Sequence, residues 1–357
     1  MKPMLARLVR ELPEQAGYLF EPKWDGFRCL ASRADEEIEL ESRHGRPLGR
    51  YFPELLAALE AIRLDPWTID GEIVLAVEGR FDFQALMGRL HPAKSRVREL
   101  AARLPATFVA FDLLELDGES LCELGFVDRR GRLETVLADA EPPVFLTPAT
   151  DDRALAERWL EQFRGGGIDG VVAKHRDLPY KPGARAMLKV KHERTADCVV
   201  AGVRLVLEPG PTGDVAHAAD PPAVASLLLG LYDAAGVLEH IGVASSFTNE
   251  RRRSLAREVS PLAVALEGHP WEQGFLTGGG PMGRLKGAAG RWVPGMTMDW
   301  VPLRPELAAE VSYTHVDGHR LRHPARFVRW RHDRDARSCL LDQLDEPPQV
   351  VDHVLAA

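Results

Sequence analysis

The pattern of apolar residues changes near residue 194, and this change limits the possible folds more than any other feature of the chain. Before it, strand-like apolar runs alternate with segments whose apolar side chains recur at helical spacing. After it, short strand-like runs and turns follow one another, with a single helix expected within residues 248–266. A chain of 357 residues can bury more than one core. We therefore predict an α+β protein of two domains, residues 1–194 and 195–357.

The first domain is expected to combine antiparallel sheets with helices. Strand-like runs lie at residues 18–23, 27–31, 38–42, 68–77, 106–114, 144–147 and 187–191. Helical periodicity marks residues 53–62, 83–90, 129–137 and 154–163. Residues 1–15 are expected to form a leading segment with a short helical turn.

The second domain is expected to be a small closed β-barrel. Its strand-like runs lie at residues 196–207, 225–232, 238–243, 301–314 and 326–330, and Thr248 is a suitable helix cap. Several short strands with one helix fit a barrel of the oligonucleotide/oligosaccharide-binding (OB) type. Residues 208–222 and 278–295 are rich in Gly and Pro and are predicted to be inserted loops.

The charge of the chain is −8, from 45 basic and 53 acidic side chains, so any nucleic-acid-binding surface must be local. Basic side chains cluster within residues 181–194 and 320–337. Such clusters are often solvated surfaces, but two of them in an acidic chain favour a basic stripe.

The cysteines and the apolar runs exclude several protein classes. Cys29, Cys122, Cys198 and Cys339 show neither a CxxC pair nor the spacing of a zinc site, and we interpret them as small buried apolar residues. The sequence has no signal-peptide core and no run of about 18 apolar residues. A cytoplasmic, nucleoid-associated protein without membrane contact is predicted.

Lys23 is the most suggestive single residue of the first domain. It follows the apolar run Tyr18-Leu19-Phe20 and precedes Gly26, so the backbone would hold its amine at the end of a strand. Asp25 can orient an ammonium and Arg28 can bind an anion. This combination suggests phosphate chemistry, although residues 21–28 taken alone favour a charged strand end on the surface.

Five short motifs occur in order along the first domain and decide between these interpretations. They are Lys23-Trp-Asp-Gly-Phe-Arg28, Ser42-Arg43-His44-Gly45, Asp70-Gly71-Glu72, Asp169-Gly-Val-Val-Ala-Lys174 and Leu188-Lys189-Val190-Lys191. Together they resemble the covalent nucleotidyltransferase superfamily of polynucleotide ligases and capping guanylyltransferases. The resemblance extends from about residue 20 to 335, and it implies an adenylation domain followed by an OB-fold domain.

The resemblance implies a covalent nucleotide on Lys23. A lysine amine must be neutral to attack the α-phosphate, and partial burial, nearby cations and a bound metal would all favour the neutral form. Lys189 and Lys191 would share one face of a strand and stabilise the leaving pyrophosphate. Glu72 and Asp169 interrupt apolar runs and would face Mg²⁺ or Mn²⁺. The family usually has Glu at the position of Asp169, so the shorter side chain would favour a water-mediated metal contact.

The remaining site residues are assigned by the resemblance alone. Phe111 would stack on the purine of ATP, although most strand aromatics are simply core residues. Glu21 would lie beside the adenine, Arg43 near the ribose and the DNA 5′-phosphate, and Lys174 at the nucleotide. Glu72 would also contact the ribose.

The late segment Arg331-His332-Asp333-Arg334 resembles the last motif of bacterial ATP-dependent DNA ligases, in which a lysine stands at the position of Arg334. Arg331 and Arg334 would serve the leaving pyrophosphate. The alternative is a solvated basic segment.

Among its relatives, the chain most resembles the bacterial repair ligases of types C and D. The implied reaction seals 5′-phosphate/3′-hydroxyl nicks in double-stranded DNA, through a Lys23–AMP intermediate, in end joining or excision repair. A monomer is expected, with a repair polymerase or primase as an optional partner. An RNA ligase, a GTP-dependent capping enzyme and a non-enzymatic nucleic-acid-binding protein remain as alternatives.

Overall fold

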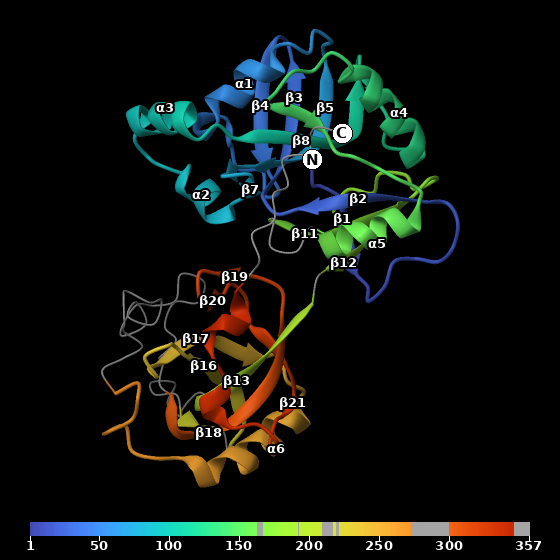
Figure 1. The fold of residues 1–357 in the computed structure, drawn as a ribbon. Helices are drawn as coiled ribbons and strands as arrows, with labels where there is room; N and C mark the ends of the chain where they lie inside the picture. Colours follow the sequence, from blue (N-terminus) through green and yellow to red (C-terminus); the bar gives the residue numbers. More distant parts are fainter. Residues whose placement is uncertain (163–166, 192, 209–216, 219–220, 273–299, 346–357) are drawn as a thin grey trace. The chain divides into compact units, whose positions relative to one another are not determined.

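The computed structural model describes residues 1–162, 167–191, 193–208, 217–218, 221–272 and 300–345 (Figure 1). The chain divides into two compact units, Met1–His192 and Glu193–Asp345. Each unit has its own hydrophobic core.

The larger sheet of the first unit has the strand order β10-β8-β5-β3-β4, with β9 (Glu119–Ser120) paired to β8. These strands are β3 (Phe27–Ala34), β4 (Glu37–Ser42), β5 (Trp67–Val74), β8 (Thr107–Leu116) and β10 (Val144–Leu146). The middle of β8 is buried on both faces, as expected for a central strand whose side chains are almost all apolar.

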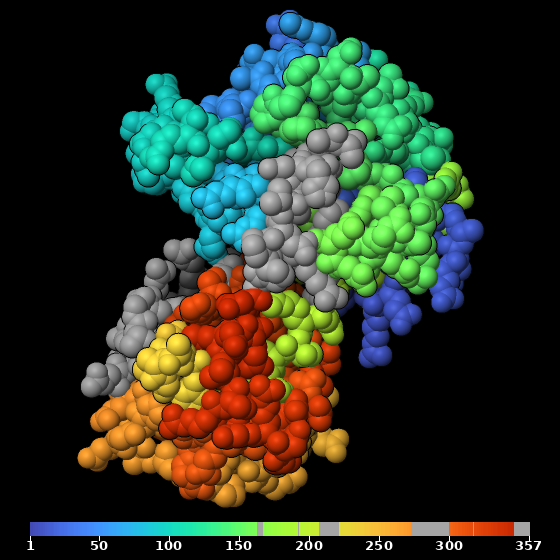
Figure 2. Space-filling model, viewed as in Figure 1, coloured from blue at the N-terminus to red at the C-terminus, as the bar shows by residue number. Residues whose placement is uncertain are grey.

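Helices cover this sheet and complete its core. They are α1 (Pro53–Leu59), α2 (Phe83–Gly88) and α4 (Phe126–Val136), whereas α3 (Lys94–Arg103) contributes no residue to this core. Helix α1 buries Leu55 and Leu59, four residues apart on one face. Helix α3 projects from the body of the unit in both views (Figures 1 and 2) and buries only Val97, which explains why no helix was expected there.

The smaller sheet of the first unit has the order β1-β12-β11-β2. It contains β1 (Leu5–Leu8), β2 (Tyr18–Trp24), β11 (Ile168–His175) and β12 (Arg185–Lys191), and α5 (Arg153–Gln162) packs against it. The expectation of a helical turn in residues 1–15 is wrong, because Leu5–Leu8 pairs in parallel with β12. That partner lies about 180 residues away in the sequence, where local periodicity gives no indication of it.

The second unit is a closed barrel with the strand order β13-β16-β17-β21-β18. Its strands are β13 (Arg194–Leu205), β16 (Val224–Tyr232), β17 (Leu238–Ser245), β18 (Val301–Tyr313) and β21 (Ala325–Trp330). Helix α6 (Asn249–Val259) begins as expected at Thr248, whose hydroxyl accepts from the Arg251 amide at 3.2 Å. The prediction of an α+β protein with an OB-like barrel is confirmed.

Short elements and uncertain segments complete the description. Paired two-residue strands are β6 (Ala76–Val77) with β7 (Arg80–Phe81), β14 (Leu207–Glu208) with β15 (His217–Ala218) and β19 (Val316–Asp317) with β20 (Arg320–Leu321). The predicted loop 278–295 lies outside the described residues, as does most of 208–222. Of the cysteines, Cys29, Cys198 and Cys339 are buried as expected, whereas Cys122 is only half-buried. None of the described helices combines the length and the apolar character needed to cross a membrane.

Candidate active site

Lys23 lies near the end of β2, where a glycine lets the chain turn closely against β5. A Cβ atom at Gly26 would lie 2.1 Å from the carbonyl oxygen of Ile73, so a side chain there would collide with backbone. The amide of Gly26 donates to Glu72 Oε1 at 3.1 Å. These two contacts of Gly26 therefore hold the end of β2, and with it Lys23, beside Glu72 of β5.

Asp169 joins two of the predicted lysines. Its Oδ2 atom lies 2.5 Å from Lys23 Nζ and 2.7 Å from Lys191 Nζ, and its side chain is only 3% exposed. The next residue, Gly170, has φ +136°, and a Cβ there would lie 2.0 Å from the Val190 carbonyl, so β11 and β12 approach closely at this point. Lys189, on the same strand as Lys191, lies near the positive charges of Lys23 and Lys191.

The charges of this cluster shift the titration of its members. Burial acts to lower the pKa of Lys23, but the charge of Asp169 and its hydrogen bond outweigh burial and raise this pKa above its ordinary value. Burial, together with the positive charges of Lys23 and Lys191, lowers the pKa of Lys189. Burial raises the pKa of Glu72 to about 7 in spite of Arg28 and Lys23 nearby. Without nucleotide, Lys23 is therefore held as an ammonium, contrary to the expectation that its surroundings favour the neutral amine.

Arg28 is fixed by a fully buried carboxylate. Its Nε and NH2 atoms each lie 2.6 Å from an oxygen of Asp70, which is also the acceptor for the Tyr180 hydroxyl at 2.6 Å. The Met4 carbonyl accepts from Arg28 at 3.2 Å. The guanidinium lies over the ring of Phe111, 4.4 Å from its centroid. Arg28 thereby packs against the ring of the predicted base-stacking residue.

Glu21 is held by two cations. Its Oε2 atom lies 2.8 Å from Lys174 Nζ and its Oε1 atom lies 3.3 Å from Arg130 NH1. Lys174 is 1% exposed and donates to the Phe111 carbonyl at 2.9 Å. Arg130 also donates to the Thr147 carbonyl at 2.7 Å. A glutamate and a lysine, both buried and both hydrogen-bonding, thus stand next to Phe111, as a site that reads the polar edge of a base requires.

A pocket opens between the two sheets of the first unit and collects most of the predicted nucleotide residues. Its lining includes Glu21, Lys23, Arg28, Arg43, Glu72, Phe111, Lys174 and Lys189. Lys191 and Asp169 join this group through the ion pairs with Lys23, and Asp25 through its charge on Lys23 and Glu72. The structure thus brings together residues that are spread over about 170 positions of the sequence.

Comparison with known proteins decides the family. The family described as ATP dependent DNA ligase domain matches residues 3–191, and the ATP dependent DNA ligase C terminal region matches residues 221–334. DNA ligase C2 of Mycolicibacterium smegmatis is 49% identical over 349 residues, which cover 98% of this chain and 95% of that protein. The chain belongs to the ATP-dependent DNA ligases. The alternatives of an RNA ligase, a capping enzyme and a non-enzymatic binding protein are therefore set aside.

Three further comparisons place the ligase within the family and support its fold. DNA ligase C of Mycobacterium tuberculosis is 45% identical over 97% of this chain and 94% of its own length. LigD of Pseudomonas aeruginosa, named as a multifunctional non-homologous end joining protein, is 29% identical over 97% of this chain but only 37% of its own length. A solved structure of a Lig E DNA ligase covers 93% of this chain and 99% of its own, with 19% identity and a TM-score of 0.53, and shows the fold alone. This ligase is close to the ligases of type C and related to the ligase domain of LigD.

The two arginines expected from the last motif lie in the second unit of the ligase. Arg331 and Arg334 follow β21 directly, and the NH1 atom of each lies 2.8 Å from Asp197 Oδ2. Both side chains are thus ordered within the barrel itself.

Glu72 and Asp169 suit a divalent metal ion only in combination with a ligand that supplies further oxygens. Among the described residues, no group of three or more His, Cys, Asp or Glu side chains could hold a metal by itself. Mg²⁺ typically binds one or two carboxylates together with substrate phosphates and water. The oxygen donors present, the half-buried carboxyl of Glu72 and the buried carboxylate of Asp169, fit that requirement.

Sequence reasoning missed several residues that shape the site. Asp70 and Tyr180 hold Arg28, Arg130 holds Glu21, and Leu5 and Ala6 line the pocket from β1. Asp70 was part of a predicted motif without an assigned role, although an acid inside an apolar strand needs a partner, and Glu72 of the same motif pairs with Arg28 across β3 and β5. The other contacts join residues more than 100 positions apart and leave no local pattern.

Proposed function

We propose that this ligase seals nicks with 5′-phosphate and 3′-hydroxyl ends in double-stranded DNA through an AMP group carried on Lys23. The observation that supports this most strongly is the position of Lys23 in a pocket with Glu21, Lys174 and Phe111 at one end and Lys189 and Arg43 in the same lining. A nucleophile, a base-binding group and phosphate-binding cations are the three parts that a nucleotidyl transfer needs.

The first chemical step follows from the charges around Lys23. Its Nζ forms a bond to the α-phosphorus of ATP, the bond to the bridging oxygen breaks, and pyrophosphate leaves with the electron pair. Lys189 and Lys191 are assigned to stabilising this developing charge, because both lie close to Lys23 and Asp169. The amine must first lose a proton, and the ion pair between Lys23 and Asp169 opposes that loss. A divalent cation bound by Glu72 and Asp169 would neutralise phosphate charge and weaken this ion pair.

Specificity for adenine is assigned to Glu21, Lys174 and Phe111. Glu21 and Lys174 are both buried, and Lys174 also donates to the Phe111 carbonyl. A base that offered the wrong donors and acceptors would leave these buried polar groups unpaired, which is costly. The aromatic ring supplies the apolar face on which the purine stacks.

The later steps transfer AMP to the 5′-phosphate of a nick and then release it when the 3′-hydroxyl attacks. Arg43 is assigned to the ribose and to the DNA 5′-phosphate, Arg28 and Asp25 to the organisation of the pocket, and Arg331 and Arg334 to the leaving pyrophosphate of the first step. We further propose a monomer that acts on DNA in the cytoplasm, in end joining or excision repair, alongside a repair polymerase or primase.

The experiment compares nick sealing and covalent labelling in Lys23→Ala and Lys23→Arg with Lys94→Ala, which changes an exposed lysine at the start of α3. Both Lys23 variants are expected to lose labelling by ATP radiolabelled in the α-phosphate and to lose sealing of an ordinary nick. Lys94→Ala should keep both activities. A Lys23→Ala protein that still forms a stable covalent nucleotide adduct contradicts the proposal.

A further inference from the structure

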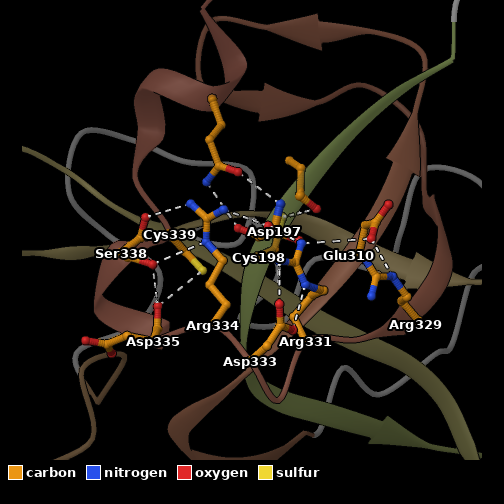
Figure 3. A network of polar contacts seen from close by, with 12 residues as sticks. Asp197, Cys198, Glu310, Arg329, Arg331, Asp333, Arg334, Asp335, Ser338 and Cys339 are labelled. Carbon is orange, nitrogen blue, oxygen red and sulfur yellow. Dashed lines mark hydrogen bonds and ion pairs between the residues drawn. The ribbon is translucent and has the colours of Figure 1, made fainter.

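Asp197 links the two arginines of the last motif through a single carboxylate. Its Oδ2 atom accepts from Arg331 NH1 and from Arg334 NH1, each at 2.8 Å, and its Oδ1 atom accepts from Arg331 NH1 at 2.9 Å (Figure 3). Asp197 belongs to β13, the strand with which the chain enters the barrel. More than 130 residues separate it from the arginines, so the sequence alone does not show the link.

The carboxylates on the two sides of Arg331 differ in exposure. The Asp333 carboxylate accepts from the Nε and NH2 atoms of Arg331 at 2.9 and 2.8 Å, but the Asp333 side chain is 63% exposed. The Asp197 side chain is only 8% exposed. An incoming phosphate oxygen can therefore replace Asp333 at the outer edge of Arg331, while the inner edge stays bound to Asp197.

Asp197 itself is held without help from the arginines. Its amide donates to Gln343 Oε1 at 3.0 Å, and its carbonyl accepts from Gln343 Nε2 at 3.2 Å. Arg334 has a second support, because its Nε and NH2 atoms donate to the hydroxyl and the carbonyl of Ser338, both at 3.2 Å. The backbone that carries the carboxylate is thus fixed on the barrel wall, and the two long arginine side chains are arranged around the carboxylate.

We propose that Asp197 is a positioning residue for the adenylation step: its charge holds Arg331 and Arg334 together in the arrangement that receives pyrophosphate. The inference rests on the proposed role of these two arginines. Two guanidinium cations whose NH1 atoms share one oxygen would repel each other without the negative charge between them. Arginine side chains also lose substantial rotamer freedom when they are fixed, and an arrangement set in advance removes that cost from the reaction.

The test separates the adenylation step from sealing. Enzyme adenylation by ATP is measured in one assay, and in another the sealing of a nick that already carries AMP on its 5′-phosphate, a reaction in which no pyrophosphate leaves. Asp197→Asn, which keeps the shape and removes the charge, is expected to slow adenylation at least tenfold and to change sealing of the adenylated nick less than threefold. Glu193→Gln changes an exposed carboxylate that pairs with Arg326 in the same unit and should leave both rates unchanged.

Asp197→Glu distinguishes charge from shape. If the charge positions the arginines, Asp197→Glu adenylates faster than Asp197→Asn, whereas a merely structural role in the packed wall would favour the isosteric Asn. Equal losses in both assays, or adenylation by Asp197→Asn within twofold of the unchanged ligase, overturn the proposal. If Asp197→Asn does not fold, Asp197→Glu decides alone: a loss confined to adenylation supports the proposal, and unchanged rates or equal losses overturn it.

Arg331→Ala and Arg334→Ala report on the underlying assignment. If both lose adenylation while Asp197→Asn keeps it, the role of the arginines stands and the positioning role of Asp197 fails. If both arginine variants adenylate at the rate of the unchanged ligase, the assignment of the arginines to pyrophosphate fails.

Discussion

Replacing Asp70 with asparagine removes the buried charge that fixes Arg28, and the structure allows the cost to be worked out. The carboxylate is fully buried, binds Arg28 through two contacts of 2.6 Å and accepts from Tyr180 at 2.6 Å. Removing one partner of a buried ion pair typically costs about 3–5 kcal/mol, because the other charge stays uncompensated. Arg28 is 21% exposed and keeps the Met4 carbonyl, so we expect a loss near the lower limit, about 3 kcal/mol.

The assay for this prediction is the thermal unfolding of the first unit, together with the adenylation rate. A loss of about 3 kcal/mol lowers the midpoint by roughly 6–12 °C for a domain of this size. Tyr180→Phe removes one hydrogen bond to the same carboxylate, which typically costs about 1.5–3 kcal/mol, and also the acceptor of the Met4 amide at 2.9 Å, so the loss should lie near the upper limit. Asp70→Asn and Tyr180→Phe both disturb the hydrogen bond between these two residues. The double variant should therefore lose less stability than the sum of the two single losses.

Adenylation should fall with Asp70→Asn even at temperatures where the unit stays folded, because Arg28 lies over Phe111 and would no longer be fixed. A midpoint within 2 °C of the unchanged protein, about 1 kcal/mol or less, together with normal adenylation would refute this reasoning.

Two further predictions concern titration in the nucleotide-free ligase. Asp169→Asn removes the main cause of the raised pKa of Lys23, so an amine-selective acylating reagent at neutral pH should modify Lys23 faster in this variant, as peptide mass spectrometry would show; slower or equal modification contradicts the ion pair as its cause. Glu72 has its pKa raised from 4.5 to about 7, so the folded state favours its protonated form and the associated stability is lost as the pH rises from about 4.5 through 7. Glutamine does not titrate, so the thermal unfolding midpoint of Glu72→Gln, relative to that of the unchanged ligase, should increase as the pH rises across that window. A difference between the two midpoints that is independent of pH would show that Glu72 titrates normally.

The sequence predicted the parts of the site that occur as short motifs. Lys23, Glu72 and Asp169 interrupt or end apolar strands, and such positions are recognisable because a buried charge requires a partner. The structure supplied the partners themselves. Asp169 binds two lysines at once, which reverses the expected effect on the pKa of Lys23.

The fold was predictable where apolar periodicity is strong, and it was missed where long-range contacts decide. Half of the residues of helix α3 are charged and its single buried residue is Val97, so its apolar positions give only a weak signal. Strand β1 exists because it pairs with β12 and not because of its own four residues. The link from Asp197 to Arg331 and Arg334 likewise depends on barrel closure, which brings β13 against β18 and β18 against β21.

The central claim is that Lys23 carries the nucleotide, and the mass of the purified ligase after incubation with ATP and Mg²⁺ tests it most directly. We expect a mass increase of one AMP, located by peptide mapping on Lys23, reversed by added pyrophosphate and absent from Lys23→Arg. An AMP group located on any other residue, or sealing of an ordinary nick with ATP by Lys23→Arg, would contradict it.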